Sequence, residues 1–156
     1  MIRTFQLVVL SSLFLSPATP GTHTTKPKGL KSFPSTHTVG ETADRAVNAI
    51  EHRGLRVLAR IDHAANARSV GEQLRPTQLI IFGNPRLGTQ LIQCSQTIAI
   101  DLPMKLLVWE DRVGKVWIGY NEVTYLSKRH DVRGCDLIVN QLKEPLETLA
   151  RTAAGG

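Results

Sequence analysis

Three side chains of this 156-residue sequence could bind a divalent metal ion: His63, Asp101 and His130. Imidazole nitrogen and carboxylate oxygen are common metal ligands, and two histidines with one carboxylate can hold such an ion. The three residues are far apart in the chain, so their spacing gives no evidence that they meet. Simpler roles compete with this hypothesis, because Asp62-His63 fits a helix start and His130 fits a helix end.

A turn-rich stretch is a second candidate, for binding an anion or another small ligand. It contains Gly83, Asn84 and Pro85, followed by Gly88 and Thr89. Backbone N–H groups at a helix start can bind an anion, and Thr89 could cap a short helix that runs to Gln96. The stretch lacks the lysine and the glycine spacing of a P-loop, so a structural turn is the competing interpretation.

Aromatic residues near the middle of the chain are a third candidate. Trp117 and Tyr120, with Trp109 on a neighbouring predicted strand, could line an apolar pocket. Packing in the core or at a dimer interface explains the same residues. No Gly-x-Ser-x-Gly motif is present in the sequence, so it carries no nucleophile-elbow signature.

The sequence contains two cysteines, Cys94 and Cys135. In an oxidising compartment they could form a disulfide, and closing a loop of this length stabilises by about 4 kcal/mol in the chain-entropy model. The sequence does not show whether their Cβ atoms approach each other, so the pairing stays open. Their spacing matches no metal-binding motif.

The N-terminus predicts an exported protein. Arg3 precedes the apolar run from Phe5 to Leu15, which is too short for the ~20 residues that span a bilayer but suits a signal peptide. Small residues follow, so cleavage is expected after Ala18 or after Gly21. We therefore predict a signal peptide over 1–21, a disordered basic linker over 22–35, and a periplasmic or secreted domain over 36–151.

The net charge of +6 is not evidence for nucleic-acid binding. Four of the lysines and arginines lie before residue 36, which leaves 15 basic against 13 acidic residues in the predicted domain. A domain with so small an excess lacks the basic character of nucleic-acid binders. We expect no nucleic acid as a partner and no membrane span.

The remaining pattern predicts helices and strands in one domain. Thr38 and Glu41 form a capping-box pattern, and apolar residues then recur at helical spacing up to Gly54. Strands are predicted at 55–61, 79–82, 106–109 and 116–120, and short helices at 62–68, from Asn121 to Arg129, and over 138–149 with a kink or break at Pro145. Leu58 breaks the alternation of the first strand, and the continuous apolar run 79–82 predicts a strand covered on both faces. The order predicts an α+β two-layer sandwich, with helices on one side of a mixed or antiparallel sheet of about four or five strands.

Several short segments, taken in order along the chain, carry a resemblance to a known family. They are Arg60-Ile61-Asp62-His63-Ala64, Leu74-Arg75-Pro76-Thr77, Phe82-Gly83-Asn84-Pro85, Gly88-Thr89, Asp101-Leu102-Pro103, Val116-Trp117-Ile118 and Tyr120-Asn121, followed by Arg129-His130. On these segments, the chain from Thr42 to Val132 resembles domain-of-unknown-function family 302, in its exported branch. The chain departs from the family pattern at Gln90 and at Glu122-Val123. The resemblance implies an α+β layer similar to one repeat of the TATA-binding protein, often as a homodimer, and this likeness of fold implies no DNA function.

Three hypotheses for function follow. The first is an exported, non-catalytic and homodimeric module that binds a small ligand or a protein partner. The second is a metal- or histidine-dependent enzyme that uses His63, His130 and Asp101. The third is a purely structural homodimer whose apolar strand face is the interface. The absence of a catalytic signature in the sequence favours a role other than catalysis.

Overall fold

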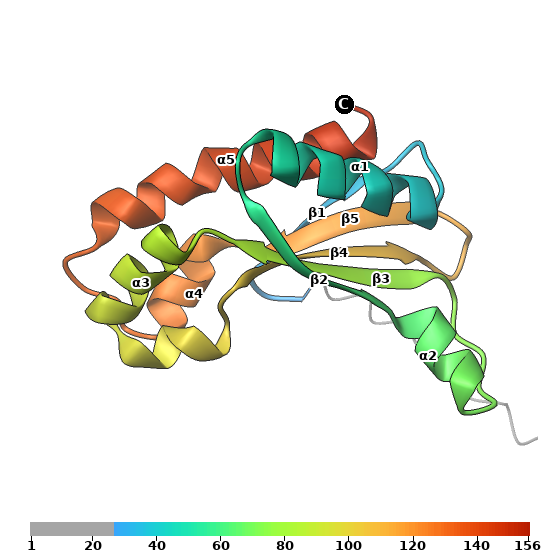
Figure 1. The fold of residues 1–156 in the computed structure, drawn as a ribbon, viewed down its shortest axis with the longest axis horizontal. Helices are drawn as coiled ribbons and strands as arrows, with labels where there is room; N and C mark the ends of the chain where they lie inside the picture. The colour runs from blue at the N-terminus through green and yellow to red at the C-terminus, as the bar shows by residue number, and fades with distance from the viewer. Residues whose placement is uncertain (1–26) are drawn as a thin grey trace, which may run out of the picture.

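The computed structural model of the chain describes residues 27–156, so the predicted signal peptide lies outside the described residues. Within the described part, five antiparallel strands form one open sheet in the order β1-β5-β4-β3-β2 (Figure 1). The strands are β1 (Leu30–Pro34), β2 (Arg56–Asp62), β3 (Thr77–Gly83), β4 (Met104–Glu110) and β5 (Val116–Asn121). The helices are α1 (Val39–His52), α2 (His63–Ser69), α3 (Pro85–Cys94), the 3-10 helix η1 (Gln96–Ile100), α4 (Val123–Arg129) and α5 (Asp136–Ala154). The predicted α+β class is confirmed, with an antiparallel sheet.

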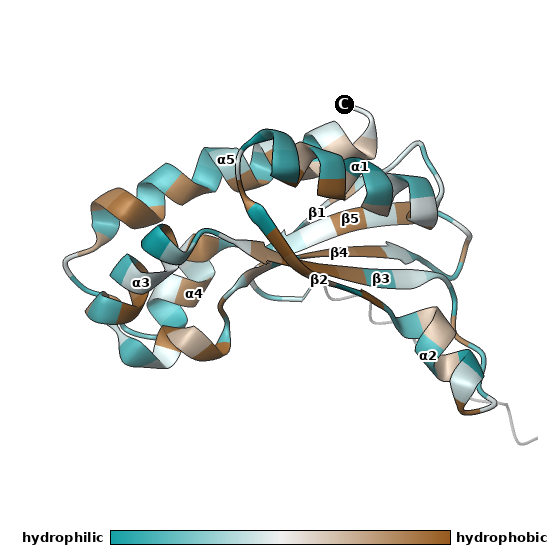
Figure 2. Cartoon of the chain, in the orientation of Figure 1, coloured by the Kyte–Doolittle hydropathy of each residue, from teal (hydrophilic) through white to brown (hydrophobic). Residues whose placement is uncertain are grey.

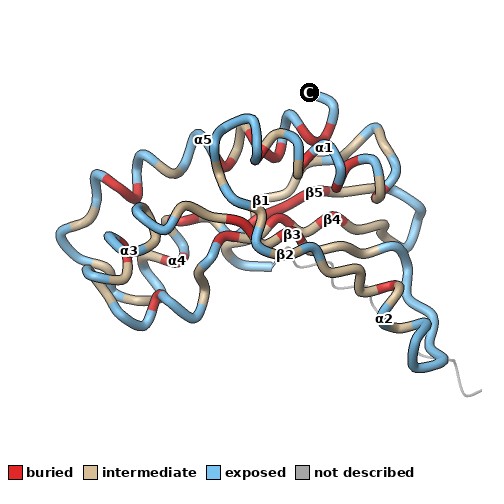
Figure 3. Tube along the Cα trace, in the orientation of Figure 1, coloured by how far each residue is buried: buried red, intermediate tan, exposed pale blue. Residues whose placement is uncertain are grey.

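Helices α1 and α5 lie side by side over one face of the sheet (Figure 1). Ala43 and Ala46 of α1, and Ala150 and Ala153 of α5, are fully buried, and such small side chains let two helices approach closely. Figure 3 shows buried segments concentrated where these two helices overlie the central strands. This part of the molecule is a packed two-layer core.

The opposite face of the sheet is less covered. On β3, Ile80 and Phe82 are buried beneath the helices, whereas Leu79 and Ile81 point to the other face and are half-buried. Figure 2 shows that β2, β3 and β4 are hydrophobic along much of their length. The prediction that residues 79–82 are covered on both faces is therefore wrong, because an apolar run does not show which face has a partner.

The folded part begins earlier than the sequence predicted. Leu30–Pro34 forms β1, which pairs with β5 from Leu30↔Asn121 to Pro34↔Trp117, so these residues are not a disordered linker. A short edge strand forms by hydrogen bonding to the backbone of one neighbouring strand. Proline is tolerated there because one edge of the strand has no partner, so a missing N–H on that side breaks no hydrogen bond of the sheet. The remaining linker residues before 27 lie outside the described part.

Most of the predicted helix caps and chain breaks agree with the structure. The capping box of Thr38 and Glu41 is formed, and Gly54, which follows the C-cap residue Arg53 of α1, has a positive φ of 68°. Asp62 caps α2, as expected for a simple structural role. Leu58 lies at a register shift between β2 and β3, which is why it breaks the alternation.

Three helix boundaries differ from the prediction. Helix α3 begins at Pro85 and is capped by Asn84, so Thr89 lies inside the helix and is not its cap. Helix α4 begins after Glu122, one residue later than expected from Asn121. Helix α5 continues past Pro145 as one element from Asp136 to Ala154, because packing along its length outweighs one missing N–H. Among the described residues, no helix has both the length and the apolar character needed to cross a membrane.

Candidate functional site

A cavity of about 470 Å³ lies between α3, α5 and the adjoining end of the sheet. Its walls are largely aliphatic: α3 contributes Leu87, Leu91 and Ile92, α5 contributes Leu142, Leu146 and Leu149, and the sheet contributes Phe82 and Met104. None of the described residues that line it is charged. Such a cavity favours an apolar and uncharged occupant, because an unpaired charge is expensive to bury.

The turn-rich stretch singled out in the sequence lies on this cavity. Gly83, Asn84, Pro85, Gly88 and Thr89 all line it. The Asn84 side-chain oxygen accepts a hydrogen bond from the Arg86 backbone N–H at 2.9 Å, so it caps α3. The stretch is therefore both a structural turn and a cavity wall, and its apolar surroundings do not suit the anion that the sequence suggested.

Two features of the cavity were not identified from the sequence. Leu55 and the bulge residue Leu58 lie on its rim, and Leu58 is 49% exposed. Bulges redirect side chains next to sites, so the break in alternation at Leu58 was an available signal. The α5 wall had no comparable signal, because its leucines also fit a buried helix face.

Helix α5 also contributes a polar residue, Gln141, to the cavity wall. Pro145 has no N–H, so the carbonyl of Gln141, four residues earlier, lacks its usual helical donor. Gln141 and Pro145 both line the cavity. Together, Asn84, Thr89 and Gln141 are lining residues with neutral polar groups in an otherwise apolar wall.

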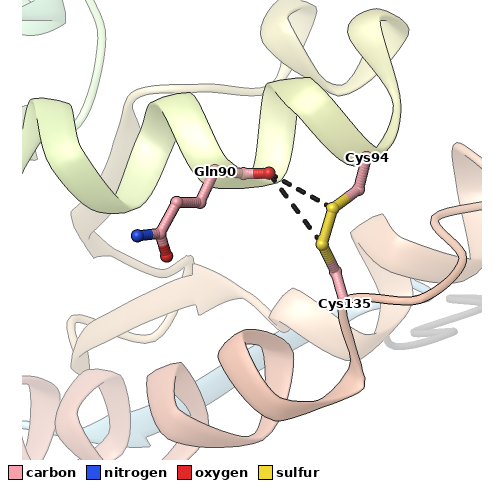
Figure 4. The surroundings of a disulfide bond; sticks show 3 residues. All are labelled: Gln90, Cys94 and Cys135. Atoms are coloured by element: carbon pink, nitrogen blue, oxygen red, sulfur yellow. Dashed lines mark hydrogen bonds between the residues drawn. A yellow bond between two sulfur atoms is a disulfide. The ribbon is translucent and has the colours of Figure 1, made fainter.

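A disulfide joins the two helical walls at one end. Cys94 is the last residue of α3 and Cys135 directly precedes α5, and their Cα atoms are 6.4 Å apart. Figure 4 shows both sulfur atoms facing the carbonyl oxygen of Gln90, at 3.2 Å from Cys94 and 3.9 Å from Cys135. The pairing that the sequence left open is thus present in the structure.

Two of the three predicted metal ligands meet. His130 Nε2 lies 2.7 Å from Asp101 Oδ2, and His130 Nδ1 lies 3.1 Å from the Thr97 hydroxyl. Arg129 approaches the same carboxylate at 3.3 Å. His63 begins α2, which lies at the other end of the sheet from η1 and α4 (Figure 1). The three-residue set is not assembled, and residues 27–156 contain no group of three potential ligands that could hold a metal.

The Asp101–His130 contact instead links η1 to the end of α4. The His130 side chain is only 8% exposed and that of Asp101 is 16% exposed. Ser95 also donates a hydrogen bond to the His130 carbonyl at 2.7 Å. This cluster fixes the segment that carries Ala99 and Leu102, which line the cavity.

Trp117 and Tyr120 do not form one pocket. They are three positions apart on β5, so their side chains point to opposite faces of the sheet. Trp117 stacks on Trp109 with ring centroids 6.4 Å apart, and its indole N–H donates to Asp111 Oδ2 at 2.8 Å. Tyr120 is buried on the helical side, where burial, with the negative charges of Glu147 and Glu122 as smaller contributions, raises its pKa to about 12. The prediction of a shared pocket is wrong.

Comparison with known proteins supports the fold. A family model described as "Domain of unknown function DUF302" matches residues 31–151. The crystal structure of an uncharacterized conserved DUF302 protein from Bacillus stearothermophilus aligns with a TM-score of 0.73 at 17% sequence identity, and covers 81% of this chain and 99% of that chain. At this identity, the likeness shows the fold alone.

Two curated relatives have names that refer to a channel. "Fluoride-specific ion channel FluC 1" of Brucella suis is 41% identical over 128 residues, which cover 81% of this chain and 50% of that protein. The protein of the same name in Brucella abortus is also 41% identical, over 47% of its length. The chain therefore spans about half the length of these relatives.

Proposed function

This chain belongs to the DUF302 family, whose description assigns no reaction, and we propose that it is an exported module that binds an uncharged, mostly apolar small ligand between α3 and α5. The observation that carries the proposal is the apolar cavity of about 470 Å³. Small-molecule sites are concave, mainly apolar and roughly 300–1,000 Å³ in volume, with a few polar groups that set orientation.

The position of the family-like segments supports the same site. Phe82 to Pro85, Gly88-Thr89 and Leu102-Pro103 are among the segments on which the resemblance to the family depends, and all of them line the cavity. They come from the end of β3, from α3 and from the turn before β4. Segments that are separate in the chain thus line the same cavity.

The polar groups of the cavity narrow the class of ligand. Asn84, Thr89 and Gln141 line the cavity and carry only neutral polar groups. A ligand with one hydroxyl or N–H group could form a hydrogen bond with one of these residues while its apolar body fills the aliphatic part. A carboxylate or ammonium would find no opposite charge among the lining residues, so ionic ligands are disfavoured.

The test of this proposal is binding of N-phenyl-1-naphthylamine, an uncharged fluorescent probe of apolar sites. Gly88 lines the cavity, and a Cβ added there meets no atom within 4 Å, so Gly88→Trp places an indole inside the cavity and should abolish binding. Gly88→Ala is the matched control and should retain binding. Arg86→Trp, on an exposed position of the same helix, controls for an added aromatic group. Equal binding by Gly88→Trp and Gly88→Ala contradicts the proposed site.

Export is supported by the signal-like residues that precede the domain and by the disulfide, since disulfides persist in oxidising compartments. Fusion of alkaline phosphatase after residue 35 tests it, because that enzyme is active only where its own disulfides form. Activity that depends on residues 1–21 is expected. An inactive, cytosolic fusion would refute export.

A second candidate function is an interaction module that pairs with another copy through the less covered sheet face. The observation that favours it is the open-face cluster, which consists of the half-buried residues Leu79, Ile81, Leu107, Trp109 and Trp117. In the Brucella relatives, the matching segment is one part of a longer protein, which also suits a domain that works beside another. Light scattering should show a dimer that Trp117→Lys converts to a monomer, whereas a monomer at every concentration contradicts this function.

A further inference from the structure

We infer that the Cys94–Cys135 disulfide is a redox latch on the cavity. When it is oxidised, it holds α3 against α5 and keeps the site formed. When it is reduced, α3 can move away from α5 and the ligand binds more weakly. This inference rests on the proposed ligand-binding function and adds the regulation of that site.

The disulfide joins the two helices that form the walls. Cys94 ends α3, which lines the cavity with Leu87 and Leu91, and Cys135 directly precedes α5, which lines it with Leu142 and Leu146. A restraint at this point acts on the distance between the walls. It therefore affects the shape of the cavity directly.

Few polar contacts hold α3 to α5. Within residues 27–156, the one polar contact between the two helices is that of the Cys135 sulfur with the Gln90 carbonyl at 3.9 Å, while Ser95, which follows α3, is hydrogen-bonded to His130. The far half of α5 is fixed differently, since Arg45 donates to the carbonyls of Ala153 and Thr152 at 3.1 and 2.9 Å. Reduction should therefore release the α3 side of the cavity and leave the α1–α5 core in place.

The disulfide is accessible to a reductant, because Cys94 and Cys135 are both only partly buried. A dithiol attacks one sulfur as a thiolate and breaks the S–S bond through a mixed disulfide, and its second thiol then releases the protein. Two electrons and two protons pass to the protein, which gains two thiols, and the dithiol becomes a disulfide.

The last turn of α3 can remain hydrogen-bonded after the disulfide is reduced. The Cys94 sulfur lies 3.2 Å from the Gln90 carbonyl, four residues earlier on the same helix. A disulfide sulfur has no proton to donate, whereas the thiol formed by reduction can donate to this carbonyl. The opened state is thus a shifted α3 with its last turn intact.

The expected effect on binding follows from preorganisation. When the two walls are already held at a fixed distance, the protein loses less conformational entropy as the ligand binds. Coupling between two states of one site is commonly worth about 5- to 150-fold in affinity, and we expect about ten-fold weaker binding after reduction.

The experiment compares the oxidised protein, the same protein reduced with dithiothreitol, and the Cys94→Ser/Cys135→Ser variant. The affinity for N-phenyl-1-naphthylamine is measured for each, together with hydrogen exchange of the amides in α3 and α1. The serine variant also controls for effects of the reductant on the probe, since its affinity should not change when dithiothreitol is added.

About ten-fold tighter binding by the oxidised protein than by the other two, with exchange accelerated by a larger factor in α3 than in α1, supports the latch. Equal affinity with equal α3 exchange in both redox states overturns it and leaves the ligand site intact. Exchange that rises by the same factor in α1 as in α3 also overturns it, because reduction then lowers the global stability without releasing α3 in particular. If the probe binds neither state, the proposed function fails, and the α3 exchange alone decides on the latch.

Discussion

The two halves of α5, on either side of Pro145, have different surroundings. The C-terminal half packs its small residues against α1, where Ala150 and Ala153 are completely buried, and its Leu146 and Leu149 also line the cavity. The N-terminal half extends toward α3, where Leu137 is 75% exposed and Leu142 lines the cavity. The end of the helix beside α1 thus serves as core, and its middle serves as a wall of the site. The difference teaches that stability and binding depend on different, adjoining parts of this small domain.

The largest expected effect is the loss of the disulfide. Replacing both cysteines by serine frees a loop with a sequence separation of 41, which should reduce the free energy of unfolding by about 4 kcal/mol in the chain-entropy model. Urea unfolding of the oxidised protein and of the double variant measures the loss. A loss near zero would mean that the N-terminal half of α5 is held without the covalent link.

Truncation of a core residue should have the next largest effect. Ile50 of α1 is completely buried, so Ile50→Ala should reduce the free energy of unfolding by about 3 kcal/mol. Leu142→Ala, in the cavity wall, should cost about 1 kcal/mol, because the side chain is only partly buried and already borders empty space. Chemical denaturation measures both, and equal losses would contradict the division between core and site.

A smaller effect is expected at the end of α5. Arg45 donates hydrogen bonds to the carbonyls of Ala153 and Thr152 in the last turn of this helix, and the Thr152 carbonyl otherwise accepts only the long, 3.4 Å bond from the Gly155 N–H. Arg45→Ala should lower stability by about 1 kcal/mol, since the side chain is exposed. Thermal unfolding gives the shift, and binding of the fluorescent probe should not change. A variant that loses probe binding would show that the two halves of α5 are coupled.

The last effect is absent at neutral pH and is confined to alkaline solution. Burial against the C-terminal half of α5 raises the pKa of Tyr120 to about 12, above its ordinary value of 10.0. The folded state therefore keeps the proton longer than the unfolded state, and the stabilisation is present below pH 10 and is lost as pH rises from 10 to 12. Unfolding measured over this range should show a decline that Tyr120→Phe reduces. An identical decline in both proteins would place the titrating group elsewhere.

Several elements were predictable because their signals are local. Helix α1 has both members of its capping box within four residues, and Gly54 supplies the positive φ that ends it. The β4–β5 hairpin has two apolar runs around one short turn. Strand β1 was missed, because its residues resemble a linker until β5 provides a backbone to pair with.

The candidate site was predictable only in part. Gly83 to Pro85 were identified by their turn-forming types, yet the cavity that they line also needs leucines from α5, more than 50 positions along the chain. His130 and Asp101 were identified by their chemistry, and the fold brings them together but places His63 elsewhere. The spacing of these residues along the sequence does not show that His130 meets Asp101 and that His63 does not.

Composition and short-range pattern were thus sufficient for the α+β class, for most helix and strand positions, and for the family resemblance. Capping, turn formation and apolar periodicity depend on residues within a few positions of one another, so the chain specifies them without its final shape. The disulfide, the cavity and the face on which each aromatic side chain lies were decided by tertiary packing. Those features depend on where distant elements come to rest against one another, and that is set by the burial of apolar surface over the whole domain.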